Sequence, residues 1–574
     1  LDLDIQEVAE KSIKDNMPVL YDRWGNNRSL LHIDTTNGDV LAYVWSADYN
    51  NTQIQWQNDM VRNPRQPWSS VKPLVYAYAL QSIPLTIDTP IYDIPLTVWS
   101  FTPNNADGKF EWLLPLREAL AHSRNIPAVK TYFAAGKEPE IKPFLQSLGL
   151  KSLRNNNSYG YSLALWAGEV PMLEMAQAYS FLSQKWEWFD INPILEIKWP
   201  DGQILYTKEP KKVVSSLKAW PAYLIWKILS DTANMPVGWI KYYAINGLKY
   251  AVKSWTSNKV IKVNGEDKSV PRDWWLATYT PSRVTMYRAG NADDKPMNKN
   301  ALGLLLNSEV NKSFYAQMLS KWYIQNQDMS PVDVDSLSIS KVTGKIATDQ
   351  TPKEFVIKTL AFNAGVWTDT NPYTLIPIDL SCGWKASPLT PMDQKINGYL
   401  FTPTSIASID LEDINKRYDG QLRWLIATWA INTSDKVLLI TKEPKEYCEW
   451  RNLDISDSIS LTTSLQDGQT VPLRFSFSFS AQSTTNPIKK ILIMSNNFVI
   501  GSYTYDALII NDTKSIKMRN VVGTGEQDLQ IVALTENNVA QVIHIPVVIG
   551  GTDGASFATP STTTGSSLYT GQIE

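Results

Sequence analysis

A serine and a lysine three residues apart could form a nucleophile and its base. Ser69 and Lys72 lie in the segment RQPWSSVKPLVYAYAL, whose apolar residues predict a buried helix. At this spacing the two side chains share one helix face, and a serine at the helix N-terminus is stabilised as its oxygen gains charge. A desolvated lysine amine can be neutral enough to take the serine proton. The pair therefore predicts acyl-transfer chemistry, although a serine cap followed by a solvated lysine fits the same four residues.

Two further motifs follow in the chain. In ALAHSRNIPAV, Ser123 and Asn125 could present a hydroxyl and an amide to one cleft from a loop between helices, or Ser123 could be an ordinary helix cap. In YAVKSWTSNK, Lys253, Ser254 and Thr256 lie on a predicted strand. Variants of S-x-x-K, S-D-N and K-T-G in this order are typical of β-lactamases and penicillin-binding proteins. Each motif is weak alone, and together they are a strong signal.

The elements that must position these residues read as an α+β domain over residues 1–330. SLLHIDTTNGDVLAYVWS alternates around an Asn-Gly turn and predicts a β-hairpin. VKPLVYAYALQS, LREALAHS, PMLEMAQAYSFLSQ and KSFYAQMLSKWYIQNQ predict helices, whereas YAVKSWTS, DWWLATYTP and RVTMYRAGN predict short strands. LDLDIQEVAEKSI predicts a short strand followed by a helix. Helices grouped around an antiparallel sheet are therefore expected.

The chain after residue 330 divides into three parts. Residues 331–455 are irregular, rich in proline and poor in predicted strands, and we interpret them as a connecting domain. Residues 456–549 show period-two strands separated by turn residues, which predicts an immunoglobulin-like β-sandwich. Residues 550–574 predict a disordered tail. Cys382 and Cys448 fit either one structural disulfide or two buried thiols.

Composition excludes several functional classes. The 574 residues carry 54 Lys and Arg against 57 Asp and Glu, which argues against nucleic acid as the main partner. Three histidines, His32, His122 and His544, leave little room for a His-based metal site or a Ser-His-Asp triad. No apolar run is long enough to span a bilayer. Because the chain begins at Leu1 without an initiator methionine, we expect an upstream anchor or domain.

With these motifs and their flanks, residues 1–330 resemble the transpeptidase domain of class A, bifunctional penicillin-binding proteins. RQPWSSVKPLVYAYAL resembles the family pattern RxPGSSFKPFVYxxAL, and LREALAHSRNIPAV, LALWAGEVPMLEMAQAY and DWWLATYTPSRVTMYRAGNADDKPM are also similar to it. The resemblance implies a β-lactamase-like serine-transpeptidase fold. The downstream region is similar to the 1C-type subgroup, which carries an extra C-terminal β domain.

The resemblance implies a role for each catalytic residue. Ser69 would be the acylated nucleophile and Lys72 its general base. Ser123 would relay a proton to the leaving amine, and Lys253 would supply positive charge beside Ser123.

It also implies the substrate contacts. Asn125 would hold the substrate peptide amide, while the hydroxyls of Ser254 and Thr256 would bind the terminal carboxylate. The backbone N–H groups of Ser69 and Thr256 would form the oxyanion hole, where loss of one donor costs roughly 10²–10³ in rate.

The implied function is peptidoglycan D,D-transpeptidation. A stem peptide ending in D-Ala-D-Ala would acylate Ser69 and release D-alanine, and an amine of a neighbouring stem would then form the cross-link. β-Lactams would trap the same serine, and no metal or organic cofactor is implied. The upstream segment would hold a membrane helix and a glycosyltransferase domain, which places this chain on the extracytoplasmic face of a bacterial membrane. The C-terminal sandwich would be a spacer or a docking module for cell-wall proteins.

Tryptophan stands at several positions where the family has glycine: Trp45, Trp68, Trp166 and Trp255. The chain has 27 glycines and 22 tryptophans, whereas about 40 glycines are usual at this length. By strand alternation the indole of Trp255 would point the same way as Lys253 and fill the substrate slot. We hypothesise that the organism reads the codon UGA as glycine, and that a translation with UGA as tryptophan produced this sequence.

Three other functions stay open at this point. A D,D-carboxypeptidase or a β-lactamase would use water in place of the acceptor amine. If Trp68 and Trp255 are genuine, an inactive peptidoglycan-binding scaffold becomes favoured. A tryptophan-rich carbohydrate-binding protein also fits the composition.

Overall fold

The computed structural model describes residues 1–362, except 56, 97–101, 155–156, 166–167, 185–187, 264–265, 299–305 and 333. Beyond them it describes 366, 368, 374–379, 384–386, 390, 395–400, 437–440, 459–472, 474–495, 498–517, 525–535 and 540–550. The chain forms two compact units. The first contains Leu1–Thr348 and Phe355–Asp369, and the second contains most of the described residues after them. The predicted division at residues 330, 455 and 549 stays a prediction.

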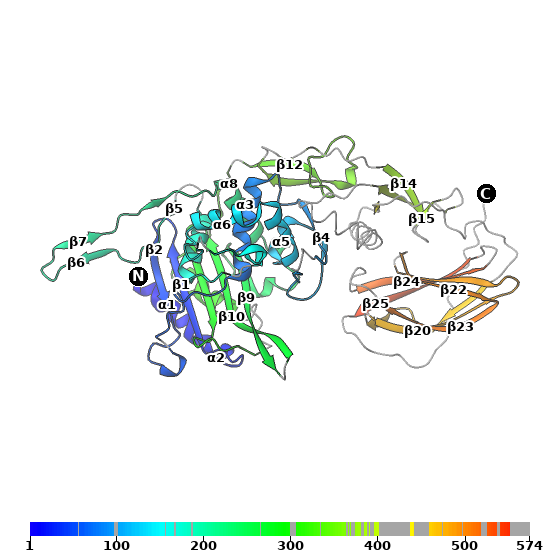
Figure 1. The fold of residues 1–574 in the computed structure, drawn as a ribbon, viewed down its shortest axis with the longest axis horizontal. Helices are drawn as coiled ribbons and strands as arrows, with labels where there is room; N and C mark the ends of the chain where they lie inside the picture. Colours follow the sequence, from blue (N-terminus) through cyan, green and yellow to red (C-terminus); the bar gives the residue numbers. More distant parts are fainter. Residues whose placement is uncertain are drawn as a thin grey trace. The chain divides into compact units, whose positions relative to one another are not determined.

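A five-stranded antiparallel sheet forms the centre of the first unit (Figure 1). Its order is β2 (Asp39–Val44), β1 (Asn27–Asp34), β11 (Arg283–Gly290), β10 (Glu266–Thr280) and β9 (Ala251–Val263). The predicted hairpin is present as β1 and β2, and Gly38 in its turn has φ 74°. The strands predicted at YAVKSWTS and DWWLATYTP are longer than expected because they continue as one long hairpin. Strand β9 lies at an edge of the sheet, with one side of its backbone unpaired by other strands.

Helices cover both faces of this sheet. On one face lie α1 (Leu3–Asp15) and α11 (Ser308–Ser320), which share a core with the sheet. The prediction of a strand before α1 is wrong. The helix begins at Leu3 because the Asp2 carboxylate accepts hydrogen bonds from the backbone N–H groups of Asp4 and Ile5, which caps the first turn.

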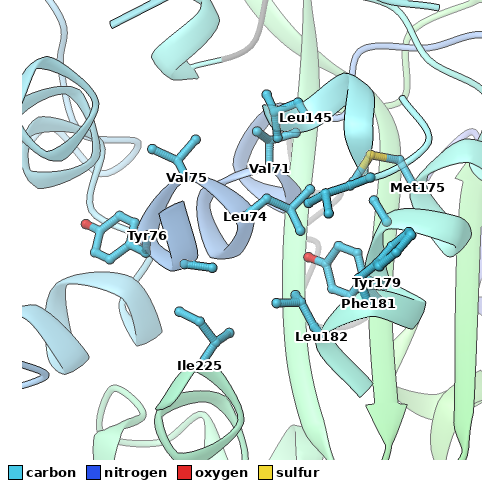
Figure 2. Close-up of a cluster of buried hydrophobic side chains, with 14 of the residues drawn as sticks. Val71, Leu74, Val75, Tyr76, Leu145, Met175, Tyr179, Phe181, Leu182 and Ile225 are labelled. Carbon is cyan, nitrogen blue, oxygen red and sulfur yellow. The ribbon is translucent and has the colours of Figure 1, made fainter. Parts of the chain in front are cut away.

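The other face packs against the larger core, which is centred on α3 (Lys72–Ser82). Helices α6 (Lys137–Ser147), α7 (Met172–Ser183) and α8 (Ala219–Leu229) contribute to it. Figure 2 shows buried side chains of α3 and its N-cap, such as Leu74 and Val71, together with side chains of α7 and α8 that pack against them, such as Tyr179 and Ile225. Helix α3 is buried on nearly every side, as predicted, so the position of the residues that begin it is fixed by packing rather than by local propensity.

The remaining elements of this unit are short. They are α2 (Met17–Tyr21), β3 (Pro90–Asp93), β4 (Trp112–Pro115), α4 (Leu116–Ala121), α5 (Asn125–Ala134), β5 (Trp188–Phe189), β6 (Glu196–Lys198), β7 (Ile204–Thr207), β8 (Lys212–Val213), α9 (Ile240–Tyr243), β12 (Asp335–Ser340) and β13 (Val356–Ala361), with 3₁₀ turns at Thr52–Ile54, Trp68–Ser70, Gly160–Leu165, Thr232–Asn234 and Lys353–Phe355. In the described part of the chain, no helix is long and apolar enough to cross a membrane.

Residues 331–455 contain more strands than predicted. Besides β12 and β13, a four-stranded sheet has the order β15 (Trp384–Lys385), β14 (Thr374–Asp379), β16 (Lys395–Leu400) and β17 (Val437–Ile440). These strands are two to six residues long, and Pro377 interrupts the pattern of β14. Alternation over so few residues is too weak to recognise in the sequence. Cys382 and Cys448 lie outside the described residues.

The C-terminal strands form two sheets around one core. The first sheet contains β18 (Ile459–Thr463), β20 (Arg474–Ser483) and β23 (Ile509–Lys517), in that order. The second has the order β19 (Gln469–Pro472), β25 (Ala540–Gly550), β24 (Gly525–Thr535), β21 (Ile488–Ser495) and β22 (Phe498–Ala507). Alternate apolar residues of both sheets, such as Phe477 and Ile531, are buried together, so the two sheets form a sandwich. The predicted disordered tail, residues 550–574, lies outside the described residues except for Gly550.

Candidate active site

The proposed nucleophile lies in the turn that opens α3. Ser69 is half-buried in the 3₁₀ turn Trp68–Ser70, and this turn lies beside strand β9. Two hydrogen bonds of the adjacent Ser70 fix this turn. The Ser70 hydroxyl donates to the carbonyl of Pro67 (2.5 Å), and the Tyr179 phenol donates to the carbonyl of Ser70 (2.7 Å). Ser69 is therefore held at the N-terminal end of a buried helix, as its motif predicts.

Lys72 is buried and joins two of the three motifs. Its Nζ donates to the carbonyl oxygen of Ser123 (2.6 Å) and to Oδ1 of Asn125 (2.7 Å). Burial, followed by the positive charges of Lys253 and Arg124, holds the pKa of Lys72 well below its ordinary value. A neutral amine has two N–H bonds and one lone pair. Because both N–H bonds have acceptors here, the lone pair of the neutral amine remains available to accept a proton, which is the property that a general base requires.

Ser123 occupies a strained backbone position at the end of α4. Its φ is 59°, and the backbone N–H groups of Ser123 and Arg124 donate to Leu120 and Ala119 (both 3.0 Å). This is the helix ending in which the left-handed residue is usually glycine. The alternative of Ser123 as a helix cap is wrong, since Arg124 precedes α5 and makes no side-chain cap. A non-glycine residue held in this conformation is typical of functional sites.

Lys253 approaches Ser123 from the sheet. Its buried Nζ donates to the Ser123 hydroxyl (2.8 Å) and to the carbonyl of Ser254 (3.0 Å). Burial lowers the pKa of Lys253 to about 7. The ammonium form is therefore partly populated at neutral pH, and the charge beside Ser123 depends on pH near neutrality.

A buried ion pair fixes the loop that carries Ser123 and Asn125. The guanidinium of Arg124 binds the carboxylate of Asp93 (2.8 Å), and both side chains are buried. Asn105 donates to the same carboxylate (2.8 Å) and accepts a hydrogen bond from the backbone N–H of Asn125 (2.8 Å). Sequence reasoning missed Asp93 and Asn105. Arg124, inside the S-R-N motif, is the one residue that could have indicated them, because a buried arginine requires a carboxylate partner. The sequence does not show which carboxylate that is.

The predicted substrate-binding residues lie around this centre. The Asn125 amide donates to the carbonyl of Asn104 (2.7 Å) while its oxygen accepts from Lys72. Ser254 and Thr256 are half-buried on β9 and alternate with the buried Lys253 and Trp255. The structure thus brings Lys72, Ser123, Asn125 and Lys253 into one hydrogen-bonded group and places Ser254 next to it. Recognition of a carboxylate by Ser254 and Thr256 stays a prediction.

The indole of Trp255 is part of the core. It is 3% exposed and lies on the same side of β9 as Lys253, as alternation predicts. Its ring stacks on Trp275, its cross-strand partner, with centroids 5.1 Å apart and 23° between the planes. The side chain is thus packed between the sheet and the helices. Trp45 is half-buried against Tyr43 and Tyr49, whereas the Trp68 side chain and Trp166 lie outside what the structure describes.

These groups can perform acyl transfer. A serine at a helix start, a buried amine able to accept its proton, and a second hydroxyl hydrogen-bonded to a second lysine provide a nucleophile, a base and a proton relay. The fold and the site together define a serine–lysine acyltransferase domain.

The family follows from the comparisons. Residues 29–304 match the penicillin-binding protein transpeptidase domain. This part of the chain therefore belongs to the transpeptidase domains of class A penicillin-binding proteins, which confirms the resemblance noted from the motifs. The 1C subgroup stays a prediction.

Two curated relatives extend this match. Penicillin-binding protein 1A/1B of Bacillus subtilis is 25% identical over 417 residues, which cover 69% of this chain and 41% of the relative. Penicillin-binding protein 1A of Neisseria meningitidis serogroup A is 27% identical over 289 residues, covering 48% and 33%. The chain thus spans at most about two fifths of the length of these relatives.

Solved structures share the fold. Penicillin-binding protein 1A of Haemophilus influenzae matches with a TM-score of 0.50 and 20% identity over 60% of this chain and 54% of that one. PonA1 of Mycobacterium tuberculosis, solved in complex with penicillin V, matches with a TM-score of 0.50 and 21% identity over 58% of this chain and 88% of that one.

Proposed function

We propose that this chain is a peptidoglycan D,D-transpeptidase that cross-links stem peptides through an acyl-enzyme on Ser69. The observation that carries the proposal is the hydrogen-bonded group in which Lys72 contacts Ser123 and Asn125 while Lys253 contacts the Ser123 hydroxyl. Three motifs far apart in the sequence meet there around buried amines. Such a group of ionisable side chains, with lowered pKa values, is favoured at catalytic sites.

In the first half of the reaction, neutral Lys72 takes the hydroxyl proton of Ser69 as Oγ attacks the penultimate D-alanine carbonyl carbon. The backbone N–H groups of Ser69 and Thr256 stabilise the oxyanion. As the peptide C–N bond breaks, Ser123 gives its proton to the leaving amine and takes up the proton that Lys72 removed from Ser69, so that Lys72 is neutral again. Lys253 donates a hydrogen bond to the Ser123 oxygen. D-Alanine leaves, and the donor peptide is an ester of Ser69.

In the second half, the amine of a neighbouring stem attacks the ester carbonyl. It passes a proton through Ser123 to Lys72, and as the ester C–O bond breaks Lys72 returns a proton to the Ser69 oxygen, which restores the serine. The product is a peptide cross-link. A β-lactam would react through the same first half and remain on Ser69, consistent with penicillin V binding by PonA1 of Mycobacterium tuberculosis.

The surrounding protein would place this reaction in the cell envelope. The curated relatives are more than twice as long as the part that matches this chain, which supports a further domain such as a glycosyltransferase with its membrane anchor. For the C-terminal sandwich we propose an immunoglobulin-like fold, supported by the parallel pairing of β19 with β25, and a role as a spacer or in docking cell-wall proteins.

Product analysis distinguishes the proposed transpeptidation from simple hydrolysis of the acyl-enzyme. The chain is incubated with a donor pentapeptide ending in D-Ala-D-Ala and an amine acceptor, and the products are identified by mass spectrometry. Cross-linked peptide together with released D-alanine supports transpeptidation. Release of D-alanine with tetrapeptide as the only other product would identify a carboxypeptidase instead.

The charge on Lys253 predicts the pH dependence. Since its pKa is lowered to about 7, the ammonium beside the Ser123 hydroxyl is lost as the pH rises through 7. The second-order rate of acylation by a penicillin should fall above that value, approaching about tenfold per pH unit. Stopped-flow acylation between about pH 6 and pH 9 measures it. Lys253→Arg, which keeps its charge, should remove this fall, and a profile of the unsubstituted chain that stays flat to pH 9 would contradict the assignment.

A further inference from the structure

A small cavity lies behind the segment of β9 that carries Lys253 and Ser254. It is lined by residues of α4, α8, α9 and β9, among them Ala121, Leu229, Tyr243 and Ser254, and by Met235 in the loop before α9. Tyr243 ends α9 and is 3% exposed. Its hydroxyl has no hydrogen-bond partner among the described residues, although it lies within interaction range of the Ser254 hydroxyl. A buried phenol gains from a hydrogen-bond partner, and the Ser254 hydroxyl on the wall of the same cavity is the candidate within its reach.

The backbone carbonyl of Tyr243 is hydrogen-bonded to a second tyrosine. The Tyr250 hydroxyl donates to the backbone carbonyl of Tyr243, and the Asn311 amide donates to the Tyr250 hydroxyl (3.1 Å). Burial raises the pKa of Tyr243, and the nearby Ser254 hydroxyl opposes this only partly. The phenol therefore keeps its proton and remains a hydrogen-bond donor throughout the working pH range.

We propose that Tyr243 is a positioning residue for carboxylate recognition, which orients the Ser254 hydroxyl by donating a hydrogen bond to its oxygen. A serine hydroxyl has one proton, and a carboxylate can only accept. When Ser254 oxygen accepts from Tyr243, its own proton is free to point at the terminal carboxylate of the substrate. This inference rests on the proposed function, since Tyr243 would orient the Ser254 hydroxyl that is proposed to bind the substrate carboxylate.

Tyr243→Phe removes only the phenolic oxygen and tests the proposal. The dissociation constant of a penicillin that carries its free carboxylate should rise about three- to tenfold, with the limiting rate of acylation unchanged. The methyl ester of the same penicillin lacks the carboxylate, so its reaction should be unaffected. Tyr315→Phe is the matched control, because it also removes a phenolic oxygen from this core, but that oxygen contacts Thr278 and Thr285 rather than Tyr243 or Ser254. It should not change the ratio of the affinities for the two ligands.

Two results would overturn this role for Tyr243. One is an unchanged affinity for the free acid in Tyr243→Phe. The other is an equal loss for the acid and the ester, which would indicate a general structural effect. If neither the chain that keeps Tyr243 nor its variant with glycine at positions 45, 68, 166 and 255 forms an acyl-enzyme, the proposed function has failed and this inference falls with it.

A different observation concerns two exposed tryptophans at helix ends. Trp24 has φ 64° and is 71% exposed, and Trp322 has φ 60° and is 80% exposed. Bulky residues are rarely found in this left-handed region. Both indoles project into solvent, where packing gives no compensation.

The hydrogen bonds at these ends define the motif in which glycine is strongly preferred. After α11, the N–H of Trp322 donates to Leu319 (3.1 Å) and the N–H of Tyr323 to Met318 (2.9 Å). After α2, the N–H of Trp24 donates to Tyr21 (3.0 Å) and that of Gly25 to Leu20 (3.1 Å). Helix α6 ends in the same way, with Gly149 at the corresponding position (φ 93°).

We infer that glycine occupies positions 24 and 322 in the protein that the cell makes, with the codon UGA read as glycine. The helix ends lie outside the catalytic motifs, so this backbone evidence is independent of the family pattern at Trp68 and Trp255. Trp226 gives the contrasting case. Its fully buried indole N–H donates to the Asp328 carboxylate (2.7 Å), as expected of a genuine tryptophan.

The gene and the native protein test this inference together. The codons at positions 24 and 322 should be UGA and the codon at 226 should be UGG. Mass spectrometry of peptides from cells that carry the gene should show glycine at 322 and tryptophan at 226. UGG codons at 24 and 322, or peptides with tryptophan at 322, would overturn it.

Discussion

Replacing Ser69 with alanine should abolish covalent labelling by penicillin and lower peptide transfer roughly a million-fold, the loss found when the nucleophile of a serine hydrolase is removed. The reason is that the acyl-enzyme cannot form, while the fold of the site does not depend on this hydroxyl. Labelling by a fluorescent penicillin, followed by gel electrophoresis, measures the effect.

The adjacent serine provides a matched control. Ser70 has the same side chain, but its buried hydroxyl donates to the carbonyl of Pro67. Ser70→Ala should lower stability by about 1 kcal/mol through the lost hydrogen bond and keep the label. Retention of the label in Ser69→Ala together with its loss in Ser70→Ala would show that the wrong serine has been identified.

Replacing Lys72 with methionine should slow acylation of Ser69 by roughly 10²–10⁴, the usual contribution of a general base. Methionine matches the length of the lysine stem but cannot accept a proton. It also leaves the carbonyl of Ser123 and the amide oxygen of Asn125 without their donor. Acylation is measured as the second-order rate constant with a penicillin, and thermal unfolding shows whether the variant is folded.

A second buried lysine serves as a control. It distinguishes the loss of a general base from the destabilisation caused by removing any buried amine. Lys130 on α5 is fully buried, and its Nζ donates to the carbonyl of Tyr92 (2.6 Å). Lys130→Met removes an amine from the same domain but none from the hydrogen-bonded group of the site, so a folded variant should acylate at nearly the normal rate. An equal slowing in both variants would mean that Lys72 acts through stability alone.

Much of the site was predictable because its residues lie in short local patterns. Ser69 lies in the turn that precedes α3, and Lys72 is the first residue of that helix, whose all-round apolar character predicts its burial. Lys253 was placed on a strand by alternation alone, and the structure confirms both the strand and the shared direction of Lys253 and Trp255.

What the sequence did not predict depends on contacts between distant segments. The partners of Arg124 are Asp93 and residues of the loop around Asn105, which no local pattern links to the S-R-N motif. The left-handed backbone of Ser123 is imposed by the end of α4, where glycine would be expected.

The strands of residues 331–455 were missed for a different reason. Their alternation covers too few residues to be distinguished from loop sequence. The start of α1 was misread because the Asp2 cap that begins the helix was taken as part of a strand.

Covalent labelling by a fluorescent penicillin, with mapping of the modified residue, tests the central claim most directly. It is carried out on the chain with tryptophan at positions 45, 68, 166 and 255, and on a variant with glycine at all four. We predict that the glycine variant is labelled on Ser69. A label on Ser69 in both proteins would mean that the active site tolerates the indoles. If the folded glycine variant takes no label, or takes it on another residue, the chain is not the transpeptidase proposed here.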